Sequence, residues 1–159
     1  MVELFIAKKN EKIMLKKGAY EVGSSHYPFM IVLHTSFFVS LLIEVIYFKS
    51  ITAIYVELLF VFLLLQLVRV WCLASLGVFW NTKIIILRGA NVVKKGPYAY
   101  IRHPNYFVVC LEIAVLPLMF GAYMTAIAFT ILNGIMLSVR IPIEEKALKE
   151  ATDYATAKT

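Results

Sequence analysis

Charged residues are scarce in this sequence: they make up 16% of its 159 residues, whereas 61% are hydrophobic. The charges occur in blocks and form no regular stripe from Pro28 to Phe48 or from Ile51 to Trp80. A soluble helical protein needs such a stripe, with polar residues recurring on its solvent face. The scarcity of charge therefore argues against a soluble helical domain. It favours one membrane domain over residues 1–159, with apolar runs that match the hydrocarbon core.

Cysteine is almost absent too. The sequence contains Cys72 and Cys110, both inside apolar segments, and neither has a partner at disulfide or metal-ligand spacing. We expect both to be small buried hydrophobic side chains. The sequence also lacks a glycine-rich dinucleotide fingerprint, a phosphate-binding loop, a His/Cys ligand set and a nucleophile beside a base. These absences argue against a metal site and against the chemistries that such motifs carry.

The basic residues are unevenly distributed, and their distribution predicts the topology. The net charge of +6 does not indicate a nucleic-acid partner, because the basic residues do not line one helix face. They gather before the first apolar run, in a central loop and in the tail: Lys8, Lys9, Lys12, Lys16, Lys17; Lys83, Arg88, Lys94, Lys95, Arg102; Lys146, Lys149, Lys158. The positive-inside bias places these three segments together in the cytoplasm of a multi-pass cell-membrane protein.

The apolar runs predict an all-α fold class, a multi-pass transmembrane helical protein. Two long spans run from about Pro28 to Phe48 and from about Ala53 to Leu76, each long enough to cross about 30 Å of hydrocarbon. The stretch from Tyr106 to Val139 is too long for one helix, so we expect a C-terminal hairpin bent at Leu118 to Ala122, with a short first arm. Pro142 suits the first turn of a new, short cytoplasmic helix.

The most informative polar stretch runs from Lys94 to Tyr106. Gly96-Pro97 marks a turn, and Pro104 keeps His103 out of helical geometry just before a helix that begins near Asn105. The unpaired N–H groups of a helix N-terminus suit an anionic group, such as the carboxylate of a methionine moiety. Tyrosines in the stretch could stack on an adenine. The same residues equally suit an interfacial belt that only anchors the hairpin.

A second polar cluster, Arg140 to Glu145, closes the hairpin. Arg140 and Glu144 are four residues apart, a spacing that suits a simple ion pair at a membrane exit. Arg140 could instead hold the anionic head group of a substrate through two parallel hydrogen bonds. The spacing alone leaves both interpretations open.

Four further ionisable residues lie within the apolar segments, where charge is costly. Glu44 and Glu57 lie toward the outer side, close to Lys49, so structural pairing or snorkelling is favoured over catalysis. His34 and Arg69 lie nearer the cytoplasmic side and are candidates to line a site.

The two clusters, taken in order, resemble the isoprenylcysteine carboxyl methyltransferase family of multi-pass membrane enzymes, which use S-adenosylmethionine (AdoMet). The matching residues are Gly96-Pro97-Tyr98-Ala99-Tyr100-Ile101-Arg102-His103-Pro104-Asn105-Tyr106 and Arg140-x-x-x-Glu144-Glu145. Four more segments are similar to a bacterial branch encoded beside type III polyketide synthases, whose members O-methylate alkylpyrones: Ala7–Glu11, His26–Phe29, Trp80–Lys83 and Glu144–Tyr154.

The resemblance implies two cofactor elements, residues 81–106 and 140–154. It assigns AdoMet contacts to a strand-like backbone at Ala90, Asn91, Val92 and Val93, and to Tyr98, His103, Pro104, Asn105, Tyr106 and Glu144. It assigns Arg140 to the substrate. The chain departs from the family at Pro142, where close relatives more often carry a basic residue. The second departure is the region before Glu3-Leu4, where relatives have another apolar helix.

By this resemblance, we expect AdoMet-dependent methylation of an oxygen on a lipophilic acceptor that enters from the bilayer. The acceptor would be an alkylpyrone or an isoprenoid or prenylcysteine carboxylate. The alternatives are a phospholipid N-methyltransferase, an NADPH-dependent membrane reductase on a related scaffold, and a membrane protein without enzymatic activity. Membrane lipids are further expected partners, and the sequence makes no prediction about the oligomeric state.

Overall fold

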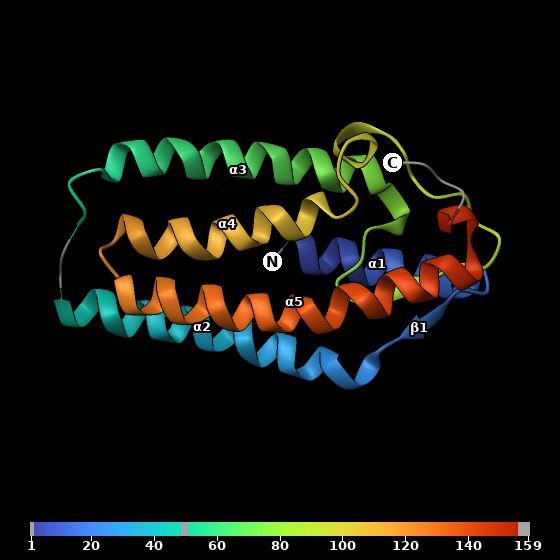
Figure 1. The fold of residues 1–159 in the computed structure, drawn as a ribbon, viewed down its shortest axis with the longest axis horizontal. Helices are drawn as coiled ribbons and strands as arrows, with labels where there is room; N and C mark the ends of the chain where they lie inside the picture. Colours follow the sequence, from blue (N-terminus) through green and yellow to red (C-terminus); the bar gives the residue numbers. More distant parts are fainter. Residues whose placement is uncertain (1, 49–50, 156–159) are drawn as a thin grey trace. The chain divides into compact units, whose positions relative to one another are not determined.

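The computed structural model describes residues 2–48 and 51–155, and helices dominate them (Figure 1). The helices are α1 (Val2–Lys16), α2 (Tyr27–Phe48), α3 (Tyr55–Leu76), α4 (Pro104–Met119) and α5 (Tyr123–Ala151). Short 3-10 turns are η1 (Ser24–His26), η2 (Gly77–Phe79), η3 (Gly96–Ala99) and η4 (Asp153–Ala155). Two strands, β1 (Tyr20–Val22) and β2 (Ile84–Ile86), pair antiparallel with Tyr20 opposite Ile86. The all-α fold class is confirmed, with one small sheet that was not predicted.

Within residues 2–48 and 51–155, three helical segments are long and apolar enough to cross a membrane: Ser24–Phe48, Tyr55–Phe79 and Tyr123–Ala151. Helix α4 is a shorter apolar helix. It ends at Met119 and α5 begins at Tyr123, so the chain turns within the predicted bend. The two long spans and the C-terminal hairpin are therefore confirmed, and the chain is a multi-pass membrane protein.

The predicted new helix at Pro142 is wrong. Helix α5 continues from Tyr123 to Ala151 with Pro142 inside it. A proline in a helix removes the one N–H that would bond the carbonyl four residues earlier, here that of Ser138. A helix continues through such a gap when the hydrogen bonds on either side persist. The predicted cytoplasmic helix is therefore the C-terminal part of α5.

The strand of the structure does not lie where the resemblance suggested. Residues 90–93 have no strand geometry, and the strand lies earlier, at Ile84–Ile86. Its three consecutive isoleucines are β-branched and favour extended backbone. Pairing with β1 satisfies the backbone groups of this segment before the chain reaches residue 90.

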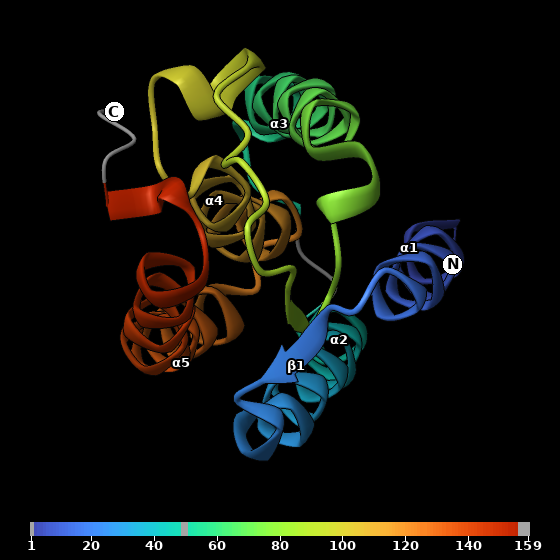
Figure 2. The ribbon, with the colours of Figure 1, turned by 90° about the vertical axis from the view of Figure 1, so that its right-hand side faces the viewer.

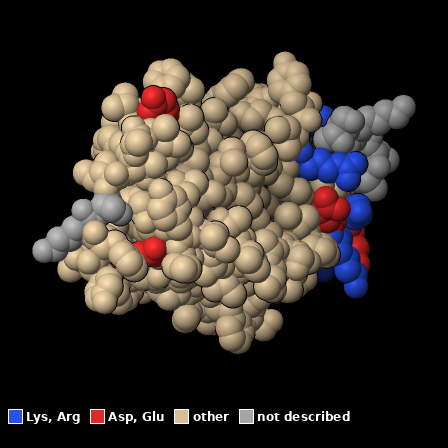
Figure 3. All heavy atoms as spheres, turned by 60° about the vertical axis from the view of Figure 1, so that its left-hand side comes forward, with Lys and Arg blue, Asp and Glu red and all other residues tan. Residues whose placement is uncertain are grey.

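The chain forms two compact units, which we call the polar unit (residues 1–27, 71–102 and 139–159) and the apolar unit (residues 28–70 and 103–138). Every Lys and Arg of the sequence except Lys49 and Arg69 belongs to the polar unit. Figure 3 shows a face on which Lys and Arg gather in one area, while most of the surface is uncharged. The predicted single domain covers both units and stays a prediction.

In the polar unit, the small sheet packs between two helices. Ile84 and Ile86 form a buried cluster with Ala147 of α5, whereas Ile85 packs with Met14 of α1. Neighbouring residues of a strand point to opposite faces, so the isoleucine run supplies an apolar surface to both sides. Figure 2 shows β1 between α1 and the C-terminal part of α5.

In the apolar unit, α4 provides the core. Its Val108 and Val115 pack with Leu65 of α3, and its Ile113 packs with Phe37 of α2 and Phe129 of α5. The rings of Phe37 and Phe129 lie 5.5 Å apart, edge to face. The short helix is thus in contact with all three longer helices of its unit.

Glu44 ties α2 to α5 within the apolar unit. Its carboxylate accepts hydrogen bonds from the N–H groups of Met124 (3.0 Å) and Thr125 (2.8 Å) and from the Thr125 hydroxyl (2.6 Å). The first N–H groups of a helix lack partners within the helix and attract negative charge. Glu44 therefore has the structural role predicted for it. Lys49, its expected neighbour, lies outside the described residues.

Candidate active site

Two predicted cofactor elements meet within the polar unit. The Val92 N–H donates to the Asp153 carboxylate (2.7 Å), and the Gly89 N–H donates to the Ala151 carbonyl (2.8 Å). The central loop is therefore bound to the segment where α5 ends. Val92 was predicted as a cofactor contact. Asp153 appeared in the sequence analysis only within the segment Glu144–Tyr154, which resembles the bacterial branch. The spacing of the residues did not indicate that its carboxylate would bind the central loop.

Tyr98 supplies an unpaired polar group to this region. Its hydroxyl is buried and has no hydrogen-bond partner in residues 2–48 and 51–155. Burial first, then the neighbouring Cys72 and Glu144, raise the pKa of the Tyr98 phenol well above its usual range, so that it stays protonated. Leaving a buried hydroxyl unpaired costs about 1–3 kcal/mol. Tyr98 and Glu144 were predicted separately as cofactor contacts, and the Glu144 charge contributes to the raised pKa of Tyr98. The Tyr98 hydroxyl is therefore a donor that a polar ligand can use.

The turn that presents Tyr98 is packed closely against the end of α3. Gly96 has a φ of +60°, and a Cβ at this position would lie 2.2 Å from Ser75 Oγ and 2.9 Å from Trp71 Nε1. Glycine is needed here for both reasons, because only glycine adopts this φ freely and because no side chain fits. The Gly96-Pro97 turn predicted from the sequence is therefore held in place by α3.

We expect Gly96→Ala to destabilise the protein more than Gly89→Ala. Gly89 also has a positive φ, +72°, but a Cβ there meets nothing within 4 Å. The backbone strain of about 1–2 kcal/mol is common to both variants, and the clash adds about 1–3 kcal/mol at Gly96 alone. Thermal unfolding in detergent measures the difference. Equal losses in the two variants would show that the turn is not packed against Ser75 and Trp71.

Glu145, next to Glu144, has several partners in the polar unit. It accepts a hydrogen bond from the Tyr154 hydroxyl (3.2 Å) and pairs with Lys149 (3.4 Å) and Arg102 (4.0 Å). Burial first, and then the Glu145 charge, raise the pKa of Tyr154 to about 12. Glu145 therefore connects the tail with the central loop, which is a structural role.

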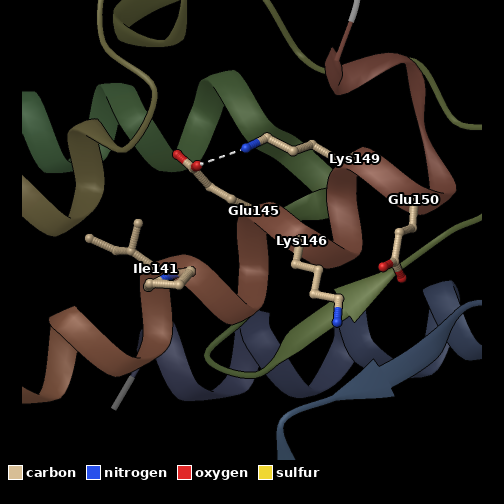
Figure 4. Close-up of a pocket in the computed structure, with 6 residues that line it drawn as sticks. Ile141, Glu145, Lys146, Lys149 and Glu150 are labelled. Carbon is tan, nitrogen blue, oxygen red and sulfur yellow. Dashed lines mark hydrogen bonds and ion pairs between the residues drawn. The ribbon is translucent and has the colours of Figure 1, made fainter.

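An open pocket lies along this stretch of α5 (Figure 4), lined by Ile141, Pro142, Glu145, Lys146, Lys149 and Glu150. In Figure 4, the side chains of Glu145 and Lys149 point toward one another. Exposed ion pairs of this kind contribute little energy and suit a solvated face. The pocket includes neither Tyr98 nor Glu144, so we do not assign it to the cofactor.

Arg140 lies in the buried part of the polar unit. Its side chain is 4% exposed, and Nη2 donates to the Thr82 carbonyl (2.7 Å). The Thr82 hydroxyl is in turn 3.2 Å from the Tyr27 hydroxyl. A buried guanidinium with its planar set of donors is a strong binder of carboxylates and other anions. The anion-holding interpretation of Arg140 and its pairing with Glu144 both stay predictions.

The segments that resemble the bacterial branch contact one another in the polar unit. The Asn10 amide donates to the Gly77 carbonyl (3.0 Å) and the Trp80 carbonyl (2.8 Å). Lys83 donates to Glu11 (2.9 Å) and Glu21 (3.0 Å). These hydrogen bonds, Glu11 first, raise the pKa of Lys83, which stays charged. Ala7–Glu11 and Trp80–Lys83 thus form one scaffold that fixes Thr82.

The predicted cofactor turn from His103 to Tyr106 belongs to the apolar unit. His103 is non-helical, with φ −127° and ψ 59°, and α4 begins at Pro104, one residue before the expected position. The rings of His103 and Tyr106 are stacked, with centroids 5.4 Å apart. The Asn105 Oδ1 atom is buried without a hydrogen-bond partner among the described residues. The geometry of the turn is confirmed, and its cofactor contacts stay a prediction.

Arg69 and His34 have partners in the apolar unit. The Arg69 guanidinium pairs with Glu112 of α4, whose other oxygen accepts a hydrogen bond from Gln66 (2.7 Å). His34 Nδ1 lies 2.9 Å from the Met30 carbonyl of its own helix. Glu112 was missed by the sequence analysis, although an acidic residue inside an apolar segment is itself a signal.

Comparison with known proteins identifies the family of the chain. Residues 56–150 match the model of the isoprenylcysteine carboxyl methyltransferase family. The chain is 48% identical over 149 residues to the uncharacterized protein YpbQ of Bacillus subtilis, covering 93% of this chain and 89% of that one. It is 30% identical over 150 residues to an uncharacterized protein of Haemophilus influenzae, covering 91% and 86%. No solved structure matches the chain. With the family match extending over α3, α4 and most of α5, the protein belongs to the isoprenylcysteine carboxyl methyltransferase family and is a membrane methyltransferase.

Proposed function

We propose that the protein transfers a methyl group from AdoMet to an oxygen of a lipophilic acceptor. The observation that supports this proposal best is the unpaired, buried Tyr98 hydroxyl beside Glu144. Both residues lie in the matched region, at residues 56–150. A hydroxyl donor beside a carboxylate suits a ligand with both acceptor and donor groups, such as a nucleoside carrying an amino acid.

By the family resemblance, the residues of the polar unit that would hold AdoMet are the backbone at Ala90–Val93, Tyr98 and Glu144. The same resemblance assigns cofactor contacts to His103, Pro104, Asn105 and Tyr106 of the apolar unit. Asp153 fixes the backbone of this loop through Val92. When bound, AdoMet supplies an activated methyl group: the acceptor oxygen forms the new C–O bond while the C–S bond breaks and its electron pair stays on sulfur. The protein has to position the acceptor oxygen and to exclude water from it.

Arg140 is the residue that we propose binds the acceptor. An enolic pyrone or a carboxylate is largely anionic at neutral pH, so methyl transfer to its oxygen needs no general base. Alignment of the reacting atoms can supply about 7–11 kcal/mol of the barrier. The role of Arg140 is then to hold the anion in line, a task that a buried guanidinium performs through two parallel hydrogen bonds.

The membrane-spanning helices support the proposed class of acceptor. Helices α2, α3 and α5 are apolar over membrane length, so an acceptor with a long alkyl or isoprenoid chain can enter from the bilayer. We propose an alkylpyrone-like acceptor, with prenylcysteine carboxylates second. We propose that the active site lies on the cytoplasmic side of the cell membrane, which the positive-inside bias of the basic residues in the polar unit supports.

A methyl-transfer assay tests the proposal. Purified protein in detergent is incubated with AdoMet carrying a labelled methyl group and, separately, a long-chain hydroxypyrone, a prenylated cysteine and phosphatidylethanolamine. We expect labelled product from the hydroxypyrone, with a rate that changes little above neutral pH. Transfer to the amine alone, rising steeply with pH, would contradict the oxygen acceptor. Stabilisation by NADPH without any methyl transfer would contradict the methyl-transfer proposal itself.

A further inference from the structure

Buried polar atoms without partners lie in two segments that contact each other at Tyr27 and Thr82. Five side-chain N and O atoms in the described residues are buried with no hydrogen-bond partner, and they include His26 Nδ1, Trp80 Nε1 and Asn81 Oδ1. Trp80 and Asn81 directly precede Thr82, and His26 directly precedes Tyr27, whose hydroxyl contacts the Thr82 hydroxyl. Native proteins leave few buried polar groups unpaired. Three such unpaired atoms in two segments that contact each other therefore indicate a binding site in which a ligand supplies the missing hydrogen-bond partners.

His26 is held in this place by close packing. Its side chain is 8% exposed and that of Trp80 is 5% exposed. A Cβ on Gly23 would lie 2.3 Å from His26 Cε1, 2.8 Å from Nδ1 and 3.2 Å from a methyl group of Ile143. Gly23, with a φ of +66°, thus leaves room for the imidazole between the β1 end and α5. This packing fixes the ring, so that its nitrogen has a defined position before any ligand binds.

Arg140 is part of the same cluster. It donates to the Thr82 carbonyl at 2.7 Å, and burial first, then the Arg140 charge, lower the pKa of His26. The indole N–H of Trp80 is a donor only, and a neutral imidazole donates from one of its two nitrogens. The cation and the two neutral donors match an anion, whereas Asn81 Oδ1 is an acceptor and matches a donor group of the same ligand.

We propose that His26 and Trp80, together with Arg140, bind the anionic head group of the methyl acceptor. This inference rests on the proposed function, because it identifies the anion with the oxygen that receives the methyl group. His26 would donate from Nδ1 and Trp80 from Nε1. Both act as binding residues that hold the anion against Arg140.

The charge change of the reaction gives this subsite a second consequence. The anionic acceptor carries a negative oxygen, and its methylated product is neutral at that oxygen. Donors arranged around an anion bind it more strongly than the corresponding ether or ester. The subsite therefore prefers substrate to product and favours product release into the bilayer.

Binding of an anion and of its methyl derivative tests the subsite without any turnover. Calorimetry on the full chain in detergent, without AdoMet, compares a long-chain hydroxypyrone with its methyl ether, and a prenylated cysteine carboxylate with its methyl ester. We expect the wild type to bind at least one anion about tenfold or more tightly than its neutral derivative. Preference for neither anion would overturn the proposal.

Matched variants separate binding from packing. His26→Phe keeps a flat ring and removes Nδ1, and Trp80→Phe removes the indole N–H. Each should reduce the preference for the anion by about tenfold or more, whereas His26→Asn, whose amide reaches the position of Nδ1, should restore most of it. Equal weakening of anion and neutral derivative by both Phe variants would show that the rings only fill space, and would overturn the proposal.

AdoMet binding to the same preparations tests the acceptor subsite and the proposed function separately. We expect all three variants to bind AdoMet within about threefold of the wild type, because none of the substituted residues is among the proposed cofactor contacts. Normal AdoMet binding with an anion preference that no variant changes would refute the subsite and leave the proposed function intact. An anion preference that depends on His26 in a protein that binds no AdoMet would support the subsite and refute the proposed methyl donor.

Discussion

Replacing Arg140 with alanine is expected to lower the rate of methyl transfer by about 100- to 1,000-fold, a loss typical of removing one group that stabilises reacting charge. AdoMet affinity should change by less than about threefold, because Arg140 is proposed to contact the acceptor and not the cofactor. The guanidinium is buried and bonded to the Thr82 carbonyl, so its position is fixed before the acceptor arrives. Steady-state kinetics and calorimetry measure the two effects separately.

Two further variants make this prediction specific. Arg140→Lys keeps the charge but loses the planar pair of donors, so we expect an intermediate rate. Arg88→Ala is the matched control, because Arg88 also belongs to the polar unit but packs over the Tyr20 ring at 5.3 Å. A loss of AdoMet affinity as large as the loss of rate in Arg140→Ala would contradict the division of roles.

The second large effect is expected on stability, at the Arg69–Glu112 pair of the apolar unit. Replacing either residue with leucine leaves the other charge without its partner, which costs about 3–5 kcal/mol when the site is buried. Replacing both with leucine should cost much less than the sum, because no uncompensated charge remains. Reversible unfolding in mixed micelles measures the four free energies of this double-mutant cycle.

The Gln66 amide provides the control for that cycle. Gln66→Leu removes only the hydrogen bond from the Gln66 amide to the Glu112 carboxylate (2.7 Å), so we expect a loss of about 1.5–3 kcal/mol. The free-energy losses of the two single leucine variants could also add up in the double variant. That result would refute a direct stabilising contact between Arg69 and Glu112.

The membrane architecture could be predicted because lipid constrains composition strongly. Apolar runs long enough to span the hydrocarbon core are typical of membrane helices. They predicted the bounds of α2, α3 and the hairpin to within a few residues. The bend between α4 and α5 could be predicted because Pro117 and Gly121 stand near the middle of the long apolar stretch from Tyr106 to Val139. Pro142 misled the prediction, because a proline ends a helix only when tertiary packing does not hold the turns on either side of it.

The candidate site could be predicted only in part. Tyr98 and Glu144 were found through the family resemblance, and the Glu144 charge contributes, after burial and Cys72, to the raised pKa of Tyr98. Contacts between distant segments, such as Asn10 with Trp80 or Lys83 with Glu11, have no periodic signal and follow only from the fold. His26 was named only within a segment that resembles the bacterial branch, and no role was predicted for it. A lone histidine becomes informative only when its burial and its missing hydrogen-bond partner are known.

AdoMet binding to the purified protein tests the central claim most directly. Calorimetry on the wild type, Tyr98→Phe, Glu144→Gln and the control Glu150→Gln should show saturable binding. Affinity should fall about tenfold in Tyr98→Phe and about ten- to a hundredfold in Glu144→Gln, where a charged hydrogen-bond acceptor is lost. Glu150, which lines the open pocket on α5, should be replaceable without effect. Wild-type protein that binds no AdoMet, or that binds it equally well in all four forms, would contradict the account.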